Sequence, residues 1–410
     1  MRTTNLRKLL CPLAIAAAFA APLPAVAGVY VQCPGDTNGD AVPETANPNI
    51  KCMHLSGGDG FAVMADGKQL YTFGFSNLTG TLPGNSGIDD RLDKGILAAQ
   101  QPAPTIDVRQ GQQFYLTLTN VGMAMRPDLF DPHSVHFHGF PNASSIFDGL
   151  PEASITINMG ASLTYYYNVQ DPGTYIYHCH VEATEHMEMG MLGQLFVTPA
   201  QDGTPVSYGG KTFTKFAYND GDGATGYDKG AALQLASFDH VFHERHIDVQ
   251  PLPFAKITTT YALINGRGYP DTANPAAVPQ ATDNPRAASI PTSQPLTSLV
   301  TLNRATEGSV LLLRLSNVSV DSLFSVTALG LPMRVVGQGA RILRANGEAS
   351  GKDLSYNTSV VTLGGGETTE VQIDTTGLPA GTYFLYTTNL NYLSNGAEDF
   401  GGMMTEIVIN

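Results

Sequence analysis

Positive charge is scarce in this sequence. Lys and Arg number 22 against 36 Asp and Glu, so the formal net charge is -14 at pH 7. Proteins that bind nucleic acids or anionic lipids generally present basic surfaces, because both partners carry dense negative charge. We therefore expect no nucleic-acid partner and no docking on anionic lipid.

Familiar catalytic signatures and helix-forming blocks are also missing. The sequence contains no Gly-rich phosphate loop and no nucleophile elbow, so nothing in it favours phosphoryl or acyl transfer. Blocks rich in Ala, Glu, Lys and Leu are scarce. Instead, Thr, Val, Tyr and Phe recur in short runs between Gly, Pro, Asn and Asp, which is typical of strands joined by turns. We expect an all-β fold, and 410 residues are enough for two domains.

The apolar run near the N-terminus, at residues 9–20, is too short to span a membrane comfortably. Arg2, Arg7 and Lys8 precede it, and the small-residue stretch "AVAG" follows at residues 25–28. This order predicts a signal peptide over residues 1–27, cleaved after Ala27, and no membrane span. We expect a periplasmic or secreted protein.

Cysteine is sparse, with four residues in the chain. Cys11 would leave with the signal peptide. In an oxidising compartment Cys33 and Cys52 can form a disulfide, which leaves Cys179 as the odd thiol. Cys179 lies between two histidines in "YHCHVEATEHMEMGM" (residues 177–191), where three histidines and three methionines accompany it. This concentration of ligand side chains favours a metal site over a structural thiol.

The chain divides into five predicted segments. They are the signal peptide at 1–27, an N-terminal extension with the disulfide at 28–100, a first β domain at 101–200, a long loop-rich connection at 201–295 and a second β domain at 296–410. "EGSVLLLRLSNVSVDS" parallels "QGQQFYLTLTNVGMAM", and "TGLPAGTYFLYTTNL" parallels "VQDPGTYIYHCHVEA". A repeat at domain scale predicts two copies of one β-sandwich.

The second copy of the repeat has lost the ligand-type side chains of the first. The first histidine cluster, "HSVHFHG", contains His133, His136 and His138. Their counterparts in the second copy are Phe324, Thr327 and Leu329. The residues opposite His178, Cys179 and His180 are Tyr386, Thr387 and Thr388. We therefore expect the first domain to carry all the metal chemistry.

Strand geometry separates the ligands of the first domain into two faces. Residues two apart in a strand point to the same side, so His178 and His180 share one face and Cys179 points to the other. A thiolate, two imidazoles and a thioether suit a blue-copper electron-transfer centre. That set is His133, Cys179, His186 and Met191. Zinc is the main alternative, because it also binds Cys and His well, but the methionine and the alternation of ligands favour copper.

Together these motifs resemble those of the multicopper oxidase family within the cupredoxins. In that family a His-x-x-His-x-His run and a His-Cys-His-x(3)-His-x(4)-Met run hold a type 1 copper and half the ligands of a trinuclear type 2/type 3 copper cluster. The resemblance implies two cupredoxin-like Greek-key β-sandwiches joined by the connection. It assigns the blue-copper set above to type 1 copper and assigns to the cluster His136, His138, His178 and His180. Asp148 in "FDGLPEA" matches the family's acidic residue that helps to deliver protons.

The sequence departs from the family pattern in two ways. The spacing from Cys179 to His186 has two extra residues, which we expect to retune the copper potential without abolishing the site. The family's cluster uses eight histidines, half of them from another domain, whereas this chain supplies four. Two other sources are conceivable. One is "DHVFHERH", with His240, His243 and His246, and the other is two first domains meeting across a subunit interface.

The function predicted from these patterns is that of an exported copper-dependent oxidoreductase of the multicopper oxidase type. A type 1 copper would take electrons from a phenol, a metal ion or an electron-donor protein, and a histidine-bound copper would reduce oxygen. The alternatives are a non-enzymatic blue-copper electron carrier and a copper-binding or tolerance protein. A nitrite reductase ranks last, because the second domain lacks its bridging histidine. Relatives with two such domains are usually trimers, so a homo-oligomer is expected.

Overall fold

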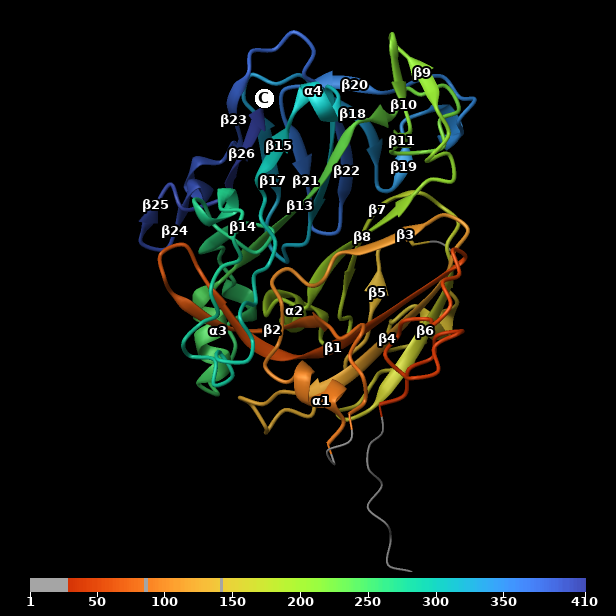
Figure 1. The fold of residues 1–410 in the computed structure, drawn as a ribbon. Coiled ribbons are helices and arrows are strands. Elements are labelled where there is room, and N and C mark those ends of the chain that lie inside the picture. Colours follow the sequence, from red (N-terminus) through yellow and green to blue (C-terminus); the bar gives the residue numbers. More distant parts are fainter. Residues whose placement is uncertain (1–28, 85–87, 141–142) are drawn as a thin grey trace, which may run out of the picture.

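The computed structural model describes residues 29–84, 88–140 and 143–410 (Figure 1). The predicted signal peptide therefore lies outside the described residues. Within the described part of the chain, no helix combines the length and apolarity needed to cross a membrane.

The first half of the molecule is a sandwich of two sheets. One sheet has the strand order β2-β1-β4-β6, formed by β2 (Gln69–Asn77), β1 (Ile50–Val63), β4 (Gln113–Gly122) and β6 (Ser162–Asn168). The other has the order β3-β8-β7-β5, formed by β3 (Ile106–Arg109), β8 (Leu192–Thr198), β7 (Gly173–His178) and β5 (His136–Phe137). Apolar side chains from both sheets form one buried cluster. Because β1 pairs in parallel with β4, residues of the predicted extension join the sheet of the first domain.

The second half is also a two-sheet sandwich with its own apolar cluster. Its larger sheet contains β14 (Tyr261–Ile264), β13 (Lys229–Phe238), β16 (Val310–Asn317), β22 (Thr368–Asp374), β18 (Met333–Gln338), β19 (Arg341–Ile342) and β20 (Tyr356–Thr358). The other sheet contains β15 (Val300–Leu302), β26 (Met404–Ile409), β23 (Gly381–Thr387), β17 (Phe324–Ala328) and β21 (Val361–Leu363). The predicted all-β, two-sandwich architecture is therefore confirmed, while the segment boundaries stay a prediction.

Several short elements complete the fold. The helices are α1 (Asp90–Gly95), α2 (Ala183–Glu188), α3 (His240–Ile247) and α4 (Arg304–Glu307). Short two-stranded pairings involve β9 (Val206–Tyr208), β10 (Lys211–Phe213), β11 (Lys215–Phe216), β12 (Gly226–Tyr227), β24 (Ser394–Asn395) and β25 (Glu398–Asp399). The segment 201–295, expected to be rich in loops, thus also contributes β13 and β14 to the larger sheet of the second half.

The internal repeat is visible in the strand register. In the first half β5 pairs with β7 so that His136 lies opposite His178. In the second half β17 pairs with β23 so that Thr327 lies opposite Tyr386. The two pairings occupy the same place in the aligned repeats, so the second sandwich keeps the backbone arrangement without the histidines.

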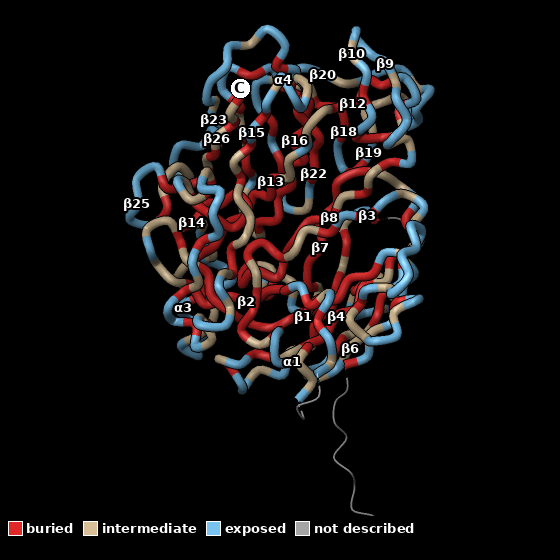
Figure 2. Tube along the Cα trace, in the orientation of Figure 1, coloured by how far each residue is buried: buried red, intermediate tan, exposed pale blue. Residues whose placement is uncertain are grey.

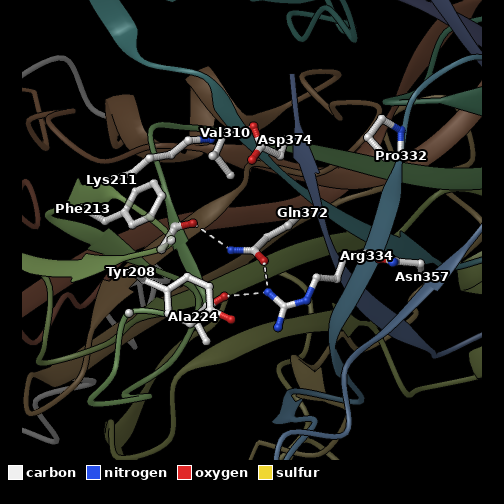
Figure 3. A pocket seen from close by; sticks show the side chains of 13 residues that line it. Tyr208, Lys211, Phe213, Ala224, Val310, Pro332, Arg334, Asn357, Gln372 and Asp374 are labelled. Atoms are coloured by element: carbon white, nitrogen blue, oxygen red, sulfur yellow. Dashed lines mark hydrogen bonds and ion pairs between the residues drawn. The ribbon is translucent and has the colours of Figure 1, made fainter. Parts of the chain in front are cut away.

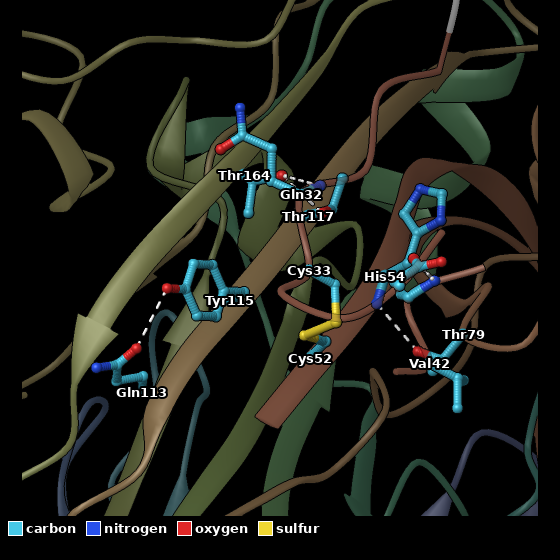
Figure 4. Close-up of a disulfide and its surroundings, with 12 residues drawn as sticks. Gln32, Cys33, Val42, Cys52, His54, Thr79, Gln113, Tyr115, Thr117 and Thr164 are labelled. Carbon is cyan, nitrogen blue, oxygen red and sulfur yellow. Dashed lines mark hydrogen bonds between the residues drawn. A yellow bond between two sulfur atoms is a disulfide. The ribbon is translucent and has the colours of Figure 1, made fainter. Parts of the chain in front are cut away.

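The predicted disulfide is present between Cys33 and Cys52 (Figure 4). It ties the N-terminal loop to β1, and both cysteines are buried in a small cluster with Ala41. On β1, two residues beyond Cys52, His54 is fully buried, and its Nε2 atom lies 2.7 Å from the Thr119 hydroxyl of β4. Burial, assisted by the positive charge of Arg91, lowers the pKa of His54 to about 4.

This buried histidine predicts an acid-sensitive stability. The unfolded chain binds a proton at His54 near pH 6.5, but the folded protein does so only near pH 4. The free energy of unfolding therefore decreases as the pH falls from 6.5 to about 4. The contribution of His54 to this decrease is about 3 kcal/mol. We expect His54→Gln to flatten the dependence of the unfolding free energy on pH between these values in denaturant titrations. His240→Gln, outside this core, serves as the control. An unchanged slope in His54→Gln would contradict the assignment.

Candidate metal centre

β7 brings the two predicted groups of ligands to opposite sides of one strand. Tyr177 and Cys179 point into the apolar cluster of the first sandwich. Ile176 lies on the other side and packs against Val318 of the second half. His178, two residues further on, shares that side. Both faces are buried, which explains why the six strand residues are buried without alternation.

On the sulfur side, the structure brings Cys179 together with two predicted histidine partners. The Cys179 Sγ atom lies 3.2 Å from Nδ1 of His186 and 4.0 Å from Nδ1 of His133. All three side chains have 0% exposure, so water is excluded from the group. The three ligand atoms lie within 4.8 Å of one another, as binding to a single metal ion requires.

Met191, the fourth predicted ligand, is buried beside this group. A Cβ atom on Gly57 of β1 would lie 2.9 Å from Cδ2 of His133 and 3.3 Å from Cε of Met191. Both side chains therefore pack against the same glycine. Gly57 is a site residue that the sequence analysis missed, since it is 76 and 134 residues away from its two neighbours.

The loop that joins Cys179 to His186 accommodates the two extra residues as a short helix. Glu182 adopts a left-handed backbone with φ of 47° and precedes α2, which contains His186. The Met191 N–H then donates to the His186 carbonyl, and the Cys179 N–H donates to the Met191 carbonyl, at 2.8 and 3.1 Å. The loop thus closes on itself and returns both side chains to the sulfur.

The electrostatics of the sulfur side favour a thiolate. Burial alone would raise the pKa of Cys179, but the charge of His186 and hydrogen bonds from His186 and His133 lower it well below the usual value. Burial would lower the pKa of His186, yet the charge of Cys179 and the nearby Asp131 carboxylate raise it to about 10. Without a metal, Cys179 is thus a thiolate and His186 an imidazolium. A cation that binds both groups takes the place of the proton on His186.

On the opposite side, three of the predicted histidines converge. Nε2 of His138 lies 3.0 Å from Nε2 of His178, and His136 completes a set of ligand atoms within 4.8 Å of one another. Nδ1 of His136 lies 2.6 Å from the Asp148 carbonyl oxygen, and Nδ1 of His178 lies 2.7 Å from that of Cys179. Since a carbonyl only accepts, these Nδ1 atoms carry the hydrogens, which leaves the Nε2 lone pairs free for a metal.

The remaining residues predicted for this side lie at its edge. The His180 ring centre is 5.0 Å from that of His136 and 5.4 Å from that of His178, but its nitrogens do not belong to the convergent set. The Asp148 carboxylate lies 3.7 Å from Nδ1 of His136 and is 30% exposed, so it connects the histidine face with solvent.

Two of the converging histidines, His138 and His178, have a lowered pKa. Burial, reinforced by the neighbouring histidines, lowers the pKa of His178 to about 3. Burial also lowers the pKa of His138, with His136 contributing in the same direction. Neutral imidazoles are the form that binds metal ions, so this face requires little proton release on binding.

The three histidines considered as additional ligands lie on α3 and face elsewhere. Their ring nitrogens contact other groups: His240 the Thr260 hydroxyl, His243 the Tyr71 carbonyl and His246 the Glu185 carboxylate. α3 instead borders the sulfur side, with Phe73 between them. The centre of the Phe73 ring lies 4.8 Å from that of His246 and 5.5 Å from that of His186. The hypothesis that one of them completes the histidine face is not supported.

Asp131 is a second site residue that the sequence analysis missed. Its carboxylate lies 3.7 Å from Nε2 of His186, on the far side of the ring from Cys179. The contact with His186 is the main cause that lowers the pKa of Asp131. The sequence motifs do not include it, because an aspartate two residues before His133 belongs to none of the recognised ligand patterns.

A cavity of about 210 Å³ in the second half is a weaker candidate site (Figure 3). Neither histidine nor cysteine contributes to its lining. Its charged groups are already paired, with Arg334 donating to Gln372 and to the Ala224 carbonyl, and Lys211 bonded to Asp374. The predicted metal ligands lie elsewhere, around β5, the end of β7 and the α2 loop.

Sequence comparison identifies relatives of this region. The family profile described as multicopper oxidase matches residues 92–202, which include both histidine clusters. Multicopper oxidase MmcO of Mycobacterium tuberculosis is 38% identical over 80 residues, 20% of this chain and 14% of that protein. Iron transport multicopper oxidase FET3 of Gibberella zeae is 38% identical over 100 residues, 23% of this chain and 15% of that protein. The matches thus cover a small part of these relatives.

Structural comparison extends over both sandwiches. Blue copper oxidase from Nitrosomonas europaea superposes with a TM-score of 0.59 at 21% identity, over 88% of this chain and 86% of that chain. Copper nitrite reductase from the same organism gives 0.54 at 14% identity, over 88% and 94%. At these identities the likeness shows the fold. The region with both histidine clusters is thus similar in sequence to multicopper oxidases, and the two-sandwich fold is shared with these solved copper proteins.

Proposed function

We propose that the protein is a copper-dependent oxidoreductase that takes electrons at a type 1 copper and passes them to copper on the histidine face, where oxygen is reduced. The observation that carries this proposal is the position of Cys179 and His178 on opposite sides of one strand end. Adjacent in the chain, they join the two sites by a short covalent path from sulfur through the backbone to imidazole.

The sulfur side fits a type 1 copper by the chemistry of its donors. His133, Cys179 and His186 would hold the ion, with Met191 as the weaker axial ligand. When bound, copper supplies one-electron redox chemistry at this position. The chain's contribution is a dry, tightly packed pocket that fixes the ligand positions, and the Asp131 carboxylate holds the ring of His186 in place.

The histidine face fits a type 2/type 3-like copper site with fewer ligands than the family's full cluster. His136, His138 and His178 would bind through Nε2, and His180 lies close enough to join after a small ring movement. Asp148 would supply protons from the solvent side, since its carboxylate lies between solvent and His136. The number of copper ions and their types are part of the proposal.

A second candidate function is a non-enzymatic blue-copper electron carrier. The specific observation in its favour is that the second half places Thr327 and Tyr386 where the first half has His136 and His178. A copper-binding or tolerance protein has the weaker support of the methionines in the α2 loop.

Partners and location belong to the same proposal. The reductant would be a small phenol, a metal ion or an electron-donor protein, and the acceptor would be oxygen. The acidic net charge of -14 favours cationic reductants or basic partner proteins, because complementary charge raises encounter rates. Export to the periplasm or the exterior and assembly as a homo-oligomer such as a trimer complete the proposal.

The central test is copper content together with the visible spectrum. We expect the Cu(II)-loaded protein to hold at least two coppers per chain, to show an intense red-end absorption band and to consume oxygen with a simple reductant. Cys179→Ser should lose the band while keeping copper on the histidine face, and Met187→Leu is the matched control. A colourless wild type would refute the type 1 assignment. A blue protein with one copper and no oxygen uptake would identify an electron carrier.

Gly57 gives a test of how the type 1 ligands are packed. An added methyl group at Gly57 would press on His133 and Met191, and overpacking of this kind costs about 1–3 kcal/mol. We expect Gly57→Ala to lower the melting temperature and to shift or weaken the blue band. Gly230→Ala is the control, because the nearest atom there is the ring edge of Tyr227 at 3.2 Å. Equal spectra and equal melting in both variants would contradict this packing role.

Asp148 gives a test of proton delivery. In Asp148→Asn the backbone carbonyl still accepts from His136, so copper content should not change. Loss of the proton donor should slow oxygen uptake by roughly a hundredfold. Glu152→Gln, at an exposed position of the same loop, is the control. Oxygen uptake rates are compared at equal copper content, and an unchanged rate in Asp148→Asn would remove this carboxylate from the proton path.

A further inference from the structure

β7 lies next to the second half of the same chain (Figures 1 and 2), and the side that Thr174, Ile176 and His178 share is covered by that half. Thr174, on that side, donates its N–H to a Glu370 carboxylate oxygen at 2.8 Å, and its carbonyl accepts from the Thr368 hydroxyl at 2.8 Å. Ile176 packs against Val318. The covered side thus runs continuously from the start of β7 to the metal-binding histidine, which is 2% exposed.

The turn that precedes β22, residues 364–367, reaches the histidine cluster itself. Gly366 has a φ of +89°, and a Cβ atom there would lie 2.6 Å from Nδ1 of His138. The backbone of Gly366 also forms a hydrogen bond with the His138 ring. The second half therefore fixes the orientation of a histidine on the first half.

This contact determines which nitrogen of His138 faces the cluster. With Nδ1 turned toward the Gly366 backbone, Nε2 points to Nε2 of His178 at 3.0 Å. Nδ1 of His178 is in turn held by the Cys179 carbonyl. Two nitrogen lone pairs that face each other at this distance repel, unless they share a cation. A metal ion bound about 2.0 Å from each nitrogen satisfies both.

We propose that the histidine face is a copper site closed within one chain, in which the 364–367 turn of the second half orients His138 and a monomer holds the copper ion. This inference rests on the proposed function, because it assumes that the histidine face binds copper. One ring nitrogen from each of His136, His138 and His178 lies within 4.8 Å of the other two, which suits a single ion, with His180 beside it.

Closure within the chain excludes one route to a larger cluster. Two first halves could meet through the His178 side of β7 only if that side were free. The second half already occupies that side through Glu370, Thr368 and Val318. The second half also brings no histidine to the β17–β23 pairing that corresponds to β5–β7. Among the residues that the structure describes, this chain therefore brings to the converging set only histidines of the first half.

Gly366→Ala tests the role of the turn, and Gly377→Ala is a matched control. Both glycines have positive φ, +89° and +77°, so an added methyl strains the backbone in each, but Gly377 has no atom within 4 Å of the new methyl. With Cu(II) alone as the probe, we expect Gly366→Ala to weaken copper binding at the histidine face at least tenfold. The blue band of the Cys179 site should stay in both variants. Equal copper affinity in the two variants would overturn the positioning role.

A dilution experiment tests whether the copper site is complete within one chain. It uses the wild-type protein, so it does not depend on whether Gly366→Ala folds. Copper per chain is measured on the wild-type protein, with sedimentation to establish the monomer. A histidine-face copper that stays bound in the monomer supports closure within the chain, whereas loss of that copper on dissociation overturns it. A wild-type protein that never binds a second copper at any concentration would instead refute the proposed histidine site, so the two failures are distinguishable.

Discussion

The fold depends on one constraint, which is that β7 must be buried on both faces. Its inward side chains, such as Tyr177, complete the core of the first sandwich, and its outward side chains, such as Ile176, need a second apolar partner. A strand of this kind cannot be stable at the surface of a single sandwich, because one apolar face would remain in water. The second half supplies that partner, and the ligands of both sites are held in position as a result.

The same constraint gives the second half a function without metal ligands. Arg314 and Glu370 lie buried at the junction, where Glu370 accepts from both Tyr218 and Thr174. A buried carboxylate is tolerated only when its oxygens are hydrogen-bonded, so this network fixes how the two halves dock. Replacing histidines by Thr327 and Tyr386 leaves this docking unaffected, since those residues lie on β17 and β23, away from the junction strands β16 and β22.

Local patterns in the sequence predict the candidate ligands, whereas contacts between distant segments have no local pattern. The His-Cys-His alternation, the Cys33–Cys52 pair and the domain repeat are local or self-similar, and each could be read directly. The parallel pairing of β1 with β4 has no such signature, so residues 28–100 did not look like part of the first sheet. Gly57 and Gly366 also have no recognisable sequence pattern. Their importance lies in the side chains that pack against them, and these come from distant parts of the sequence.

The two sides of β7 also differ in the protons that a metal must displace. On the sulfur side, the pKa of His186 is raised to about 10 by the thiolate and Asp131, although burial opposes the shift, so a cation has to release a proton there at neutral pH. On the histidine side, burial lowers the pKa of His178 to about 3, so the nitrogen is already bare. Acidification therefore weakens binding at the sulfur side first. The two candidate sites on one strand thus differ in pH dependence, because the sulfur side pairs a thiolate with a histidine of raised pKa, whereas burial lowers the pKa of His178 on the other side.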